Sequence, residues 1–193
     1  MVHTPDHLNR AGPPVRRAVA IDFQRVGFVI GNMLLAIMLF MIPPALTDLV
    51  VNPRGFWVFA ASAFVAGFLG LMLVMSARGN LTEDIYLKEG FVLTVASWIS
   101  LILVSTIPFI FYGKGMSVID AWFETVSGLT GTGTTVMAQL DDMTPGILLW
   151  RSIIQWIGGI GIILMALIML PFLKVGGMQL FQTESSDRTD KFV

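Results

Sequence analysis

The sequence predicts an all-α membrane protein with four transmembrane helices, one re-entrant pore half-helix and a filter-like loop. Three observations support this prediction. First, 55% of the 193 residues are hydrophobic and only 13% are charged, which is too apolar for an ordinary soluble domain. Second, four apolar stretches are each long enough to cross the hydrocarbon core of a bilayer. Third, a Thr/Gly-rich run, SGLTGTGTTV, follows a fifth apolar stretch that is too short to span.

The four predicted spans each have the roughly 20 apolar residues that a transmembrane helix needs. They run over residues 26–46, 56–76, 90–112 and 146–173. The first is longer than the apolar part of a signal peptide and follows a polar leader, so we expect it to be retained. We divide the chain into a cytoplasmic N-terminal tail, an N-terminal helix pair, a helix–pore–helix unit and a cytoplasmic linker, at residues 1–25, 26–78, 88–173 and 174–193.

Lysines and arginines gather on one side of these spans. Nine of the twelve lie in the leader, between the second and third spans, or after the fourth span: Arg10, Arg16, Arg17, Arg25, Arg78, Lys88, Lys174, Arg188 and Lys191. Because cytoplasmic segments near span ends are enriched in these residues, we place both termini in the cytoplasm. The outer side then receives the remaining cations and four predicted interface aromatics: Arg54, Lys114, Arg151, Trp57, Tyr112, Trp122 and Trp150.

The segment from Ser117 to Leu129 is too short and too polar to span, because its 13 residues include Asp120 and Glu124. We expect a half-helix that enters the membrane from outside. Asp120 either complements the dipole at the helix start or attracts cations, and Glu124 is either a brace behind the following loop or a cation-attracting group. Arg151 is a candidate partner for Glu124, and it also suits a position at the outer interface.

The loop after the half-helix reads TGTGT from Thr130 to Thr134. Non-helical backbone at membrane depth is tolerated only where protein covers it or where it lines a path for water or ions. Carbonyl oxygens can replace the hydration shell of a monovalent cation, and glycine supplies backbone with positive φ. Alternatively, Gly128, Gly131 and Gly133 only let helices pack closely. A phosphate-binding loop is disfavoured, because the lysine of such a motif is missing.

The fourth predicted span contains Gly158, Gly159 and Gly161 within about one helical turn. Glycine allows helices in lipid to approach closely, and it also weakens a helix and can mark a bend. The three residues therefore form either a packing surface or a bend point beneath the loop.

Other functional classes find little support in the sequence. The chain has no cysteine, and its two histidines, His3 and His7, lie in the polar leader. No nucleophile–base pair and no metal-ligand cluster stands out, so we expect neither an enzyme nor a covalently bound cofactor. The net charge of −1 says little, because most of the cations lie on one side of the predicted spans, but the absence of a basic face argues against nucleic acid as a partner.

Three segments resemble the Trk/Ktr/HKT potassium transporters, in particular the bacterial TrkH-type membrane subunits. They are DAWFETVSGLTGTGTTV at 120–136, RSIIQWIGGIGIILMALIMLPFLKVGGMQLF at 151–181 and ESSD at 184–187. The resemblance implies that residues 88–173 are the first of four helix–pore–helix repeats around one pathway. Gly133 matches the family's filter glycine, and it implies a potassium site at Thr132 and Gly133, with Thr134 also in the filter line. Gly131 departs from the family, where threonine is common.

The resemblance also implies a setting and partners. We expect a multi-pass protein of the bacterial inner membrane, with potassium as the transported substrate and lipid as its solvent. One loop cannot form a ring of carbonyls, so three further repeats must come from a missing chain segment or from other subunits; we expect the linker 174–193 to be truncated. A homodimer and a cytosolic TrkA-type nucleotide-binding ring are the other implied partners. The alternative is a non-conducting membrane scaffold or regulatory fragment.

Overall fold

The computed structural model of the chain describes residues 22–77, 87–113, 115–137 and 143–189. Most of the predicted cytoplasmic tail, including Arg10, Arg16 and Arg17, lies outside these residues, as do Arg78, Lys114 and Lys191. In the described part of the chain all regular structure is helical. It comprises α1 (Phe23–Phe40), α2 (Ile42–Val51), α3 (Pro53–Ser76), α4 (Leu87–Tyr112), α5 (Val118–Leu129) and α6 (Pro145–Thr189).

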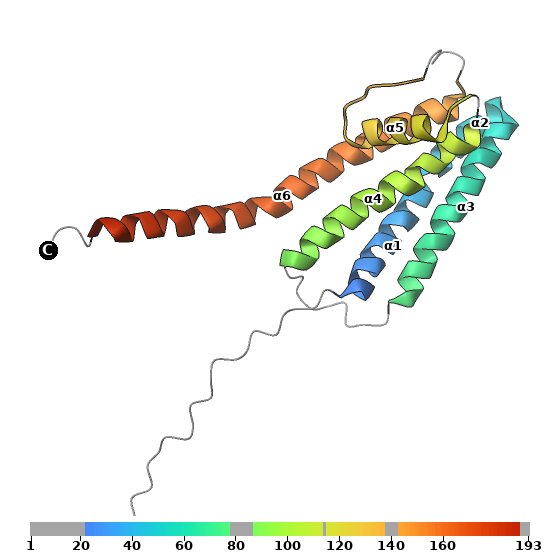
Figure 1. Ribbon diagram of the computed structural model, residues 1–193. Helices are drawn as coiled ribbons and strands as arrows, with labels where there is room; N and C mark the ends of the chain where they lie inside the picture. Colours follow the sequence, from blue (N-terminus) through green and yellow to red (C-terminus); the bar gives the residue numbers. More distant parts are fainter. Residues whose placement is uncertain (1–21, 78–86, 114, 138–142, 190–193) are drawn as a thin grey trace, which may run out of the picture.

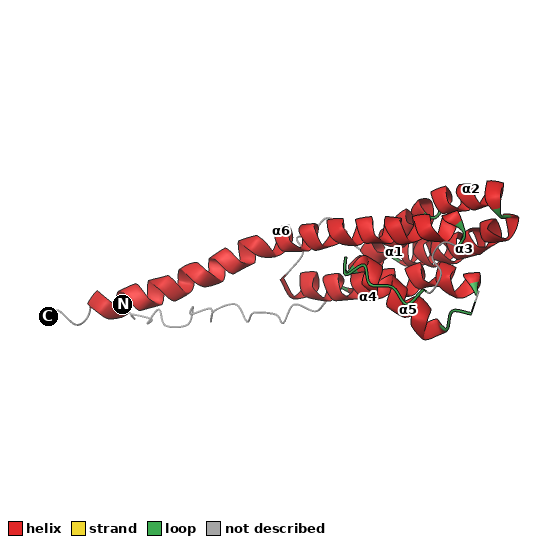
Figure 2. Ribbon diagram, turned by 90° about the horizontal axis from the view of Figure 1, so that it is seen from above, coloured by secondary structure: helices red, strands yellow, loops and turns green. Residues whose placement is uncertain are grey.

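The helices form a bundle that is capped at one end. In Figure 1, α1, α3 and α4 run side by side, while the short helix α5 lies across the end of the bundle where α2 and the start of α6 are found. Figure 2 shows that the second half of α6 extends away from the other helices. The filter-like loop follows α5 and returns toward α6 at this capped end.

Four helical stretches are long and apolar enough to cross a membrane, which confirms the four predicted spans. They are Phe23–Val51, Pro53–Ser76, Glu89–Tyr112 and Pro145–Leu167. α5 has 12 residues and is not among them. The helix α6 continues through residues 174–189, so most of the predicted linker is helical in its backbone.

The first span is divided in two, which the hydropathy pattern did not predict. α1 ends at Phe40, Met41 forms a turn, and α2 begins at Ile42. Pro43 and Pro44 explain the break, because proline lacks the N–H that would continue the hydrogen bonds of α1. The same prolines are tolerated in the first turn of α2, where those N–H groups have no helical partner.

The N-terminal helix pair packs through small residues. A Cβ added at Gly31 of α1 would lie 2.8 Å from the carbonyl oxygen of Gly70 in α3, and a Cβ added at Gly70 would lie 2.9 Å from that of Gly31. This close approach is typical of helix packing in lipid. Near the start of α1, a buried ion pair joins Arg25 to Glu89 of α4 at 3.3 Å.

Trp150 is fully buried inside the bundle, so the prediction that it is an aromatic anchor facing the lipid is wrong. Its Nε1 donates a hydrogen bond to the carbonyl oxygen of Ser105 at 3.1 Å, and its ring meets that of Phe59 edge-on at 6.3 Å. Trp57 and Trp122 are 70% and 54% exposed, as an interface position requires. An indole that has a polar partner inside the bundle does not need the interface.

Candidate ion-filter site

The half-helix α5 begins with a capping box. The Ser117 hydroxyl accepts a hydrogen bond from the backbone N–H of Asp120 at 3.1 Å, and the Asp120 carboxylate accepts one from the Ser117 N–H at 3.0 Å. The side chain and then the backbone of Ser117 lower the pKa of Asp120 below its ordinary value. These contacts favour the helix-start interpretation of Asp120 over the cation-attracting one.

The chain leaves the helix at Thr130 and enters irregular backbone. The N–H of Thr130 still donates to the carbonyl oxygen of Val126, and the N–H of Gly131 donates to that of Gly128. Gly131 and Gly133 then both have φ of +73°. Residues with a side chain rarely adopt this conformation, so both positions favour glycine.

Glu124 holds the far end of the loop from behind. Its side chain is buried, and Oε1 accepts hydrogen bonds from the N–H of Val136 at 2.6 Å and of Met137 at 3.3 Å, and from the Thr135 hydroxyl. Oε2 lies 3.0 Å from Nε of Arg151, as an ion pair rather than an aligned hydrogen bond. The structure thus brings together the two charges that the sequence offered as partners.

Ser127 provides a second attachment between the half-helix and the loop. Its hydroxyl donates to the carbonyl oxygen of Thr134 at 2.6 Å, and its own carbonyl oxygen accepts from the N–H of Gly133 at 3.2 Å. The loop is therefore fixed to α5 at Gly133 and at the residue that follows it. Sequence reasoning missed Ser127, although its position one turn after Glu124 on the helix was an available signal.

The loop has a covered side and an open side. Residues 130–134 are exposed, whereas Glu124, Ser127 and Leu129 behind them are buried. The Thr130 and Thr132 hydroxyl oxygens lie 2.9 Å apart on the exposed stretch. The polar side chains of Glu124 and Ser127 thus hold the buried side of the loop, while the Thr/Gly run of residues 130–134 is exposed on its other side.

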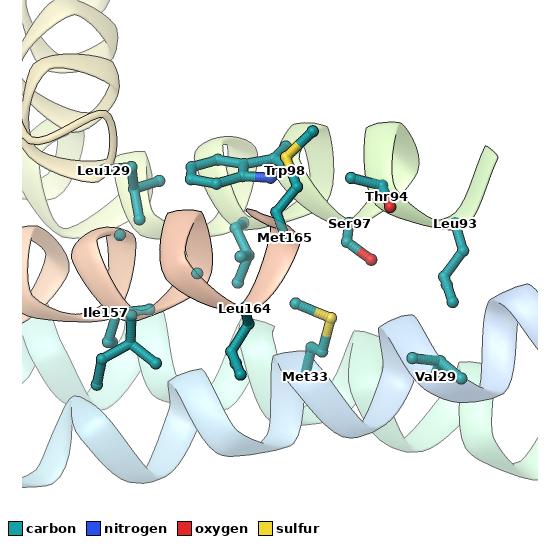
Figure 3. A pocket seen from close by; sticks show the side chains of 14 residues that line it. Val29, Met33, Leu93, Thr94, Ser97, Trp98, Leu129, Ile157, Leu164 and Met165 are labelled. Carbon is teal, nitrogen blue, oxygen red and sulfur yellow. The ribbon is translucent and has the colours of Figure 1, made fainter. Parts of the chain in front are cut away.

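Of the three α6 glycines, Gly158 supports close packing most clearly. A Cβ at Gly158 would collide with the backbone of Leu129 at the end of α5. A Cβ at Gly161 would meet the ring of Trp98 at 3.6 Å, an ordinary contact, and one at Gly159 would meet nothing within 4 Å. Gly158 therefore lets α6 touch the half-helix where the loop begins. Beside this contact lies an apolar cavity of about 330 Å³ between α1, α4 and α6, with Leu129 at its wall (Figure 3).

Residues 57–191 match the TrkH family, described as cation transport proteins. The chain belongs to the TrkH family. Members of this family are membrane ion transporters rather than enzymes.

Individual relatives of the TrkH family extend beyond this chain. The Trk system potassium uptake protein TrkI from Halomonas elongata is 48% identical over 103 residues, which are 53% of this chain and 21% of that protein. The Trk system potassium uptake protein TrkH from Escherichia coli K12 is 37% identical over 165 residues, which are 85% of this chain and 34% of that protein. The chain therefore spans about a third or less of the relatives it matches.

A solved TrkH structure shares the fold. The crystal structure of the potassium transporter TrkH from Vibrio parahaemolyticus aligns with a TM-score of 0.74 and 33% sequence identity. The alignment covers 87% of this chain and 36% of that chain. The helical bundle described above is thus a TrkH fold in its N-terminal portion.

Proposed function

We propose that this chain supplies one quarter of a carbonyl-lined potassium filter, for potassium uptake across the bacterial cytoplasmic membrane. The observation that carries the proposal is the run Thr130–Thr134, which has two glycines at positive φ and is held from behind by Glu124. Within this run we assign the potassium site to Thr132 and Gly133. Gly131 and Thr134 lie in the same filter line.

The electrostatics of the loop suit a dehydrated monovalent cation. The exposed run consists of threonine and glycine, so it carries no formal charge. The nearby Glu124 charge faces the back of the loop and is paired with Arg151. Carbonyl and hydroxyl dipoles can replace the hydration shell of such an ion without binding it too tightly to leave. The carbonyl end of α5 also lies at the start of the run, which adds a partial negative charge.

A complete filter needs more than this loop. Rings of carbonyls come from about four loops, and the described residues contain one. The remaining three repeats come from a further chain segment or from other subunits. Both termini lie in the cytoplasm on this proposal, where a TrkA-type nucleotide-binding ring has access to the assembly, and the complete transporter forms a homodimer.

Growth of a potassium-uptake-deficient bacterium on limiting potassium tests the proposal. Three strains carry the chain alone, the chain with a second polypeptide that provides three further repeats, and the same pair with Gly133→Asp. We expect growth only with the unmodified pair, because an aspartate at Gly133 places a bulky charge in the filter line. Gly115→Asp is the matched control, since Gly115 also has positive φ, of +79°, but lies outside the loop.

Each outcome separates the candidates. Growth with the chain alone would require a ring built from copies of this chain. Growth that survives Gly133→Asp would reject the filter assignment. Absence of growth in all strains, despite confirmed insertion in the membrane, would favour the non-conducting scaffold.

A further inference from the structure

Asp48 is a fully buried acidic residue of α2 that the filter proposal does not use. Its Oδ1 accepts a hydrogen bond from the N–H of Gly146, in the first turn of α6, at 2.8 Å. Its Oδ2 has no hydrogen-bond donor among the described residues. A buried carboxylate is costly unless its surroundings stabilise the charge, so its environment needs an explanation.

Two helix starts provide that environment. Gly55 lies in the first turn of α3 and Gly146 in the first turn of α6, and a Cβ added at either residue would collide with the Asp48 carboxyl group. The carboxylate therefore rests directly against the backbone of both first turns. Helix N-termini carry a partial positive charge and unpaired N–H groups, which favour an anion at this position. The pair of glycines makes the contact possible.

The same helix start leads to the filter brace. Arg151 follows Gly146 on α6 within about two turns. It is Arg151 that pairs with Glu124, which in turn holds the N–H groups of Val136 and Met137. A shift or rotation at the start of α6 would therefore change the position of Arg151 relative to Glu124.

We propose that Asp48 is a positioning residue for the ion filter. Its carboxylate fixes the start of α6 against the N-terminal helix pair and thereby keeps Arg151 in register with Glu124. The consequence for transport rests on the proposed function, whereas the consequence for helix position does not. Asp48 touches no ion on this account and acts through α6.

The first experiment measures helix position in the assembled transporter. The chain has no cysteine, so two introduced cysteines, Ile119→Cys on α5 and Ser152→Cys on α6, can be spin-labelled specifically. The other repeats must also be free of cysteine. The distance between the two labels then reports the position of α6 relative to α5. We expect Asp48→Asn to shift or broaden this distance, because the amide removes the negative charge from between two positive helix ends. Asp22→Asn is the matched control, because Asp22 accepts hydrogen bonds at the start of α1 and asparagine caps helices equally well.

The second experiment measures the uptake of potassium in competition with sodium by the same assembly. We expect Asp48→Asn to lower the potassium-to-sodium preference at least about threefold, because the hydrogen bond from the Gly146 N–H is weaker when its acceptor is not charged. Asp22→Asn should leave the preference unchanged. An unchanged spin-label distance would overturn the inference whatever the transport result. An unchanged preference, with uptake reduced only in proportion to the amount of protein in the membrane, would also overturn it. Gly133→Ala in the same assay tests the proposed function separately.

Discussion

The N-terminal helix pair and the filter region are stabilised by different kinds of contact. α1 and α3 cross at Gly31 and Gly70 through backbone and apolar contacts. The loop after α5 is instead held by hydrogen bonds and a buried charge pair, which involve Ser127, Glu124 and Arg151. Both regions are part of one bundle of membrane-spanning helices.

The difference follows from the state of the backbone in each region. A helix satisfies its own N–H and C=O groups, so two helices in lipid need only fit closely. An irregular loop leaves those groups open, and at membrane depth other protein groups must satisfy them. Changes at the α1–α3 crossing should therefore affect stability alone, whereas changes in the filter region, or in Asp48, which positions α6 on our proposal, should affect ion selectivity as well.

The largest expected effect comes from Glu124→Gln. The substitution removes the charge that pairs with Arg151, and loss of one partner of a buried pair costs about 3 kcal/mol. Because Arg151 is 22% exposed, we expect a destabilisation nearer to 2 kcal/mol. Potassium-to-sodium preference should fall with it, because the N–H groups of Val136 and Met137 lose their carboxylate acceptor. Thermal unfolding and competitive uptake measure the two effects.

Glu89→Gln is the matched change outside the filter, since Glu89 forms a buried pair with Arg25. We expect a similar loss of thermal stability with an unchanged ion preference. Equal loss of preference in both variants would contradict the distinction between the two regions.

Gly158→Ala should have the next largest effect. The new methyl group would collide with the Leu129 backbone, and overpacking of this kind costs about 1–3 kcal/mol. Separation of α6 from α5 should lower both the unfolding temperature and the ion preference. Gly31→Ala introduces a milder collision in the helix pair, where the new Cβ would lie 2.8 Å from the carbonyl oxygen of Gly70, and it should lower the unfolding temperature alone. If Gly158→Ala left transport unchanged, the contact would be packing without a functional role.

Gly131→Thr introduces the residue that the resemblance to the Trk/Ktr/HKT transporters implies at this position, and we expect it to harm rather than help. A threonine at φ of +73° carries roughly 1–2 kcal/mol of strain. The loop can relieve this strain by moving out of its filter conformation, and a cost of this size corresponds to about a tenfold fall in potassium uptake. Gly115→Thr, at φ of +79° outside the loop, should show the strain in thermal unfolding without the loss of uptake. Improved uptake in Gly131→Thr would mean that the loop adapts in the full assembly.

The smallest effect is a pH dependence at the start of α5. Ser117 lowers the pKa of Asp120 in the folded protein, so the ionised carboxylate stabilises the fold above its ordinary value of 3.8. This contribution is lost as the pH falls through the lower, folded pKa. The difference in unfolding temperature between the unmodified protein and Asp120→Asn should therefore be present at neutral pH and vanish in acid. A difference that persisted in acid would show that the charge is not responsible.

Hydropathy was sufficient to predict the four spans. The short polar stretch that precedes the Thr/Gly run was sufficient to predict a short helix followed by irregular backbone. The pairing of Glu124 with Arg151 could be proposed from sequence because isolated charges at membrane depth need partners. The break at Met41 was missed because the span was judged by its apolar length, without weighing its two prolines. The role of Asp48 was not predictable, since its partner Gly146 is 98 residues away and the third contributor, Gly55, has no distinctive pattern.

Competitive uptake by the assembled transporter with Gly133→Ala, beside Gly115→Ala, tests the central claim most directly. Both glycines have positive φ and open space around the added methyl group, apart from a 3.6 Å contact to Gln155 at Gly133. If residues 130–134 form part of the filter, Gly133→Ala lowers the potassium-to-sodium preference about tenfold, because the added methyl group introduces roughly 1–2 kcal/mol of backbone strain. Gly115→Ala leaves the preference unchanged. Equal preferences in the two variants would contradict the assignment of this loop to the ion path.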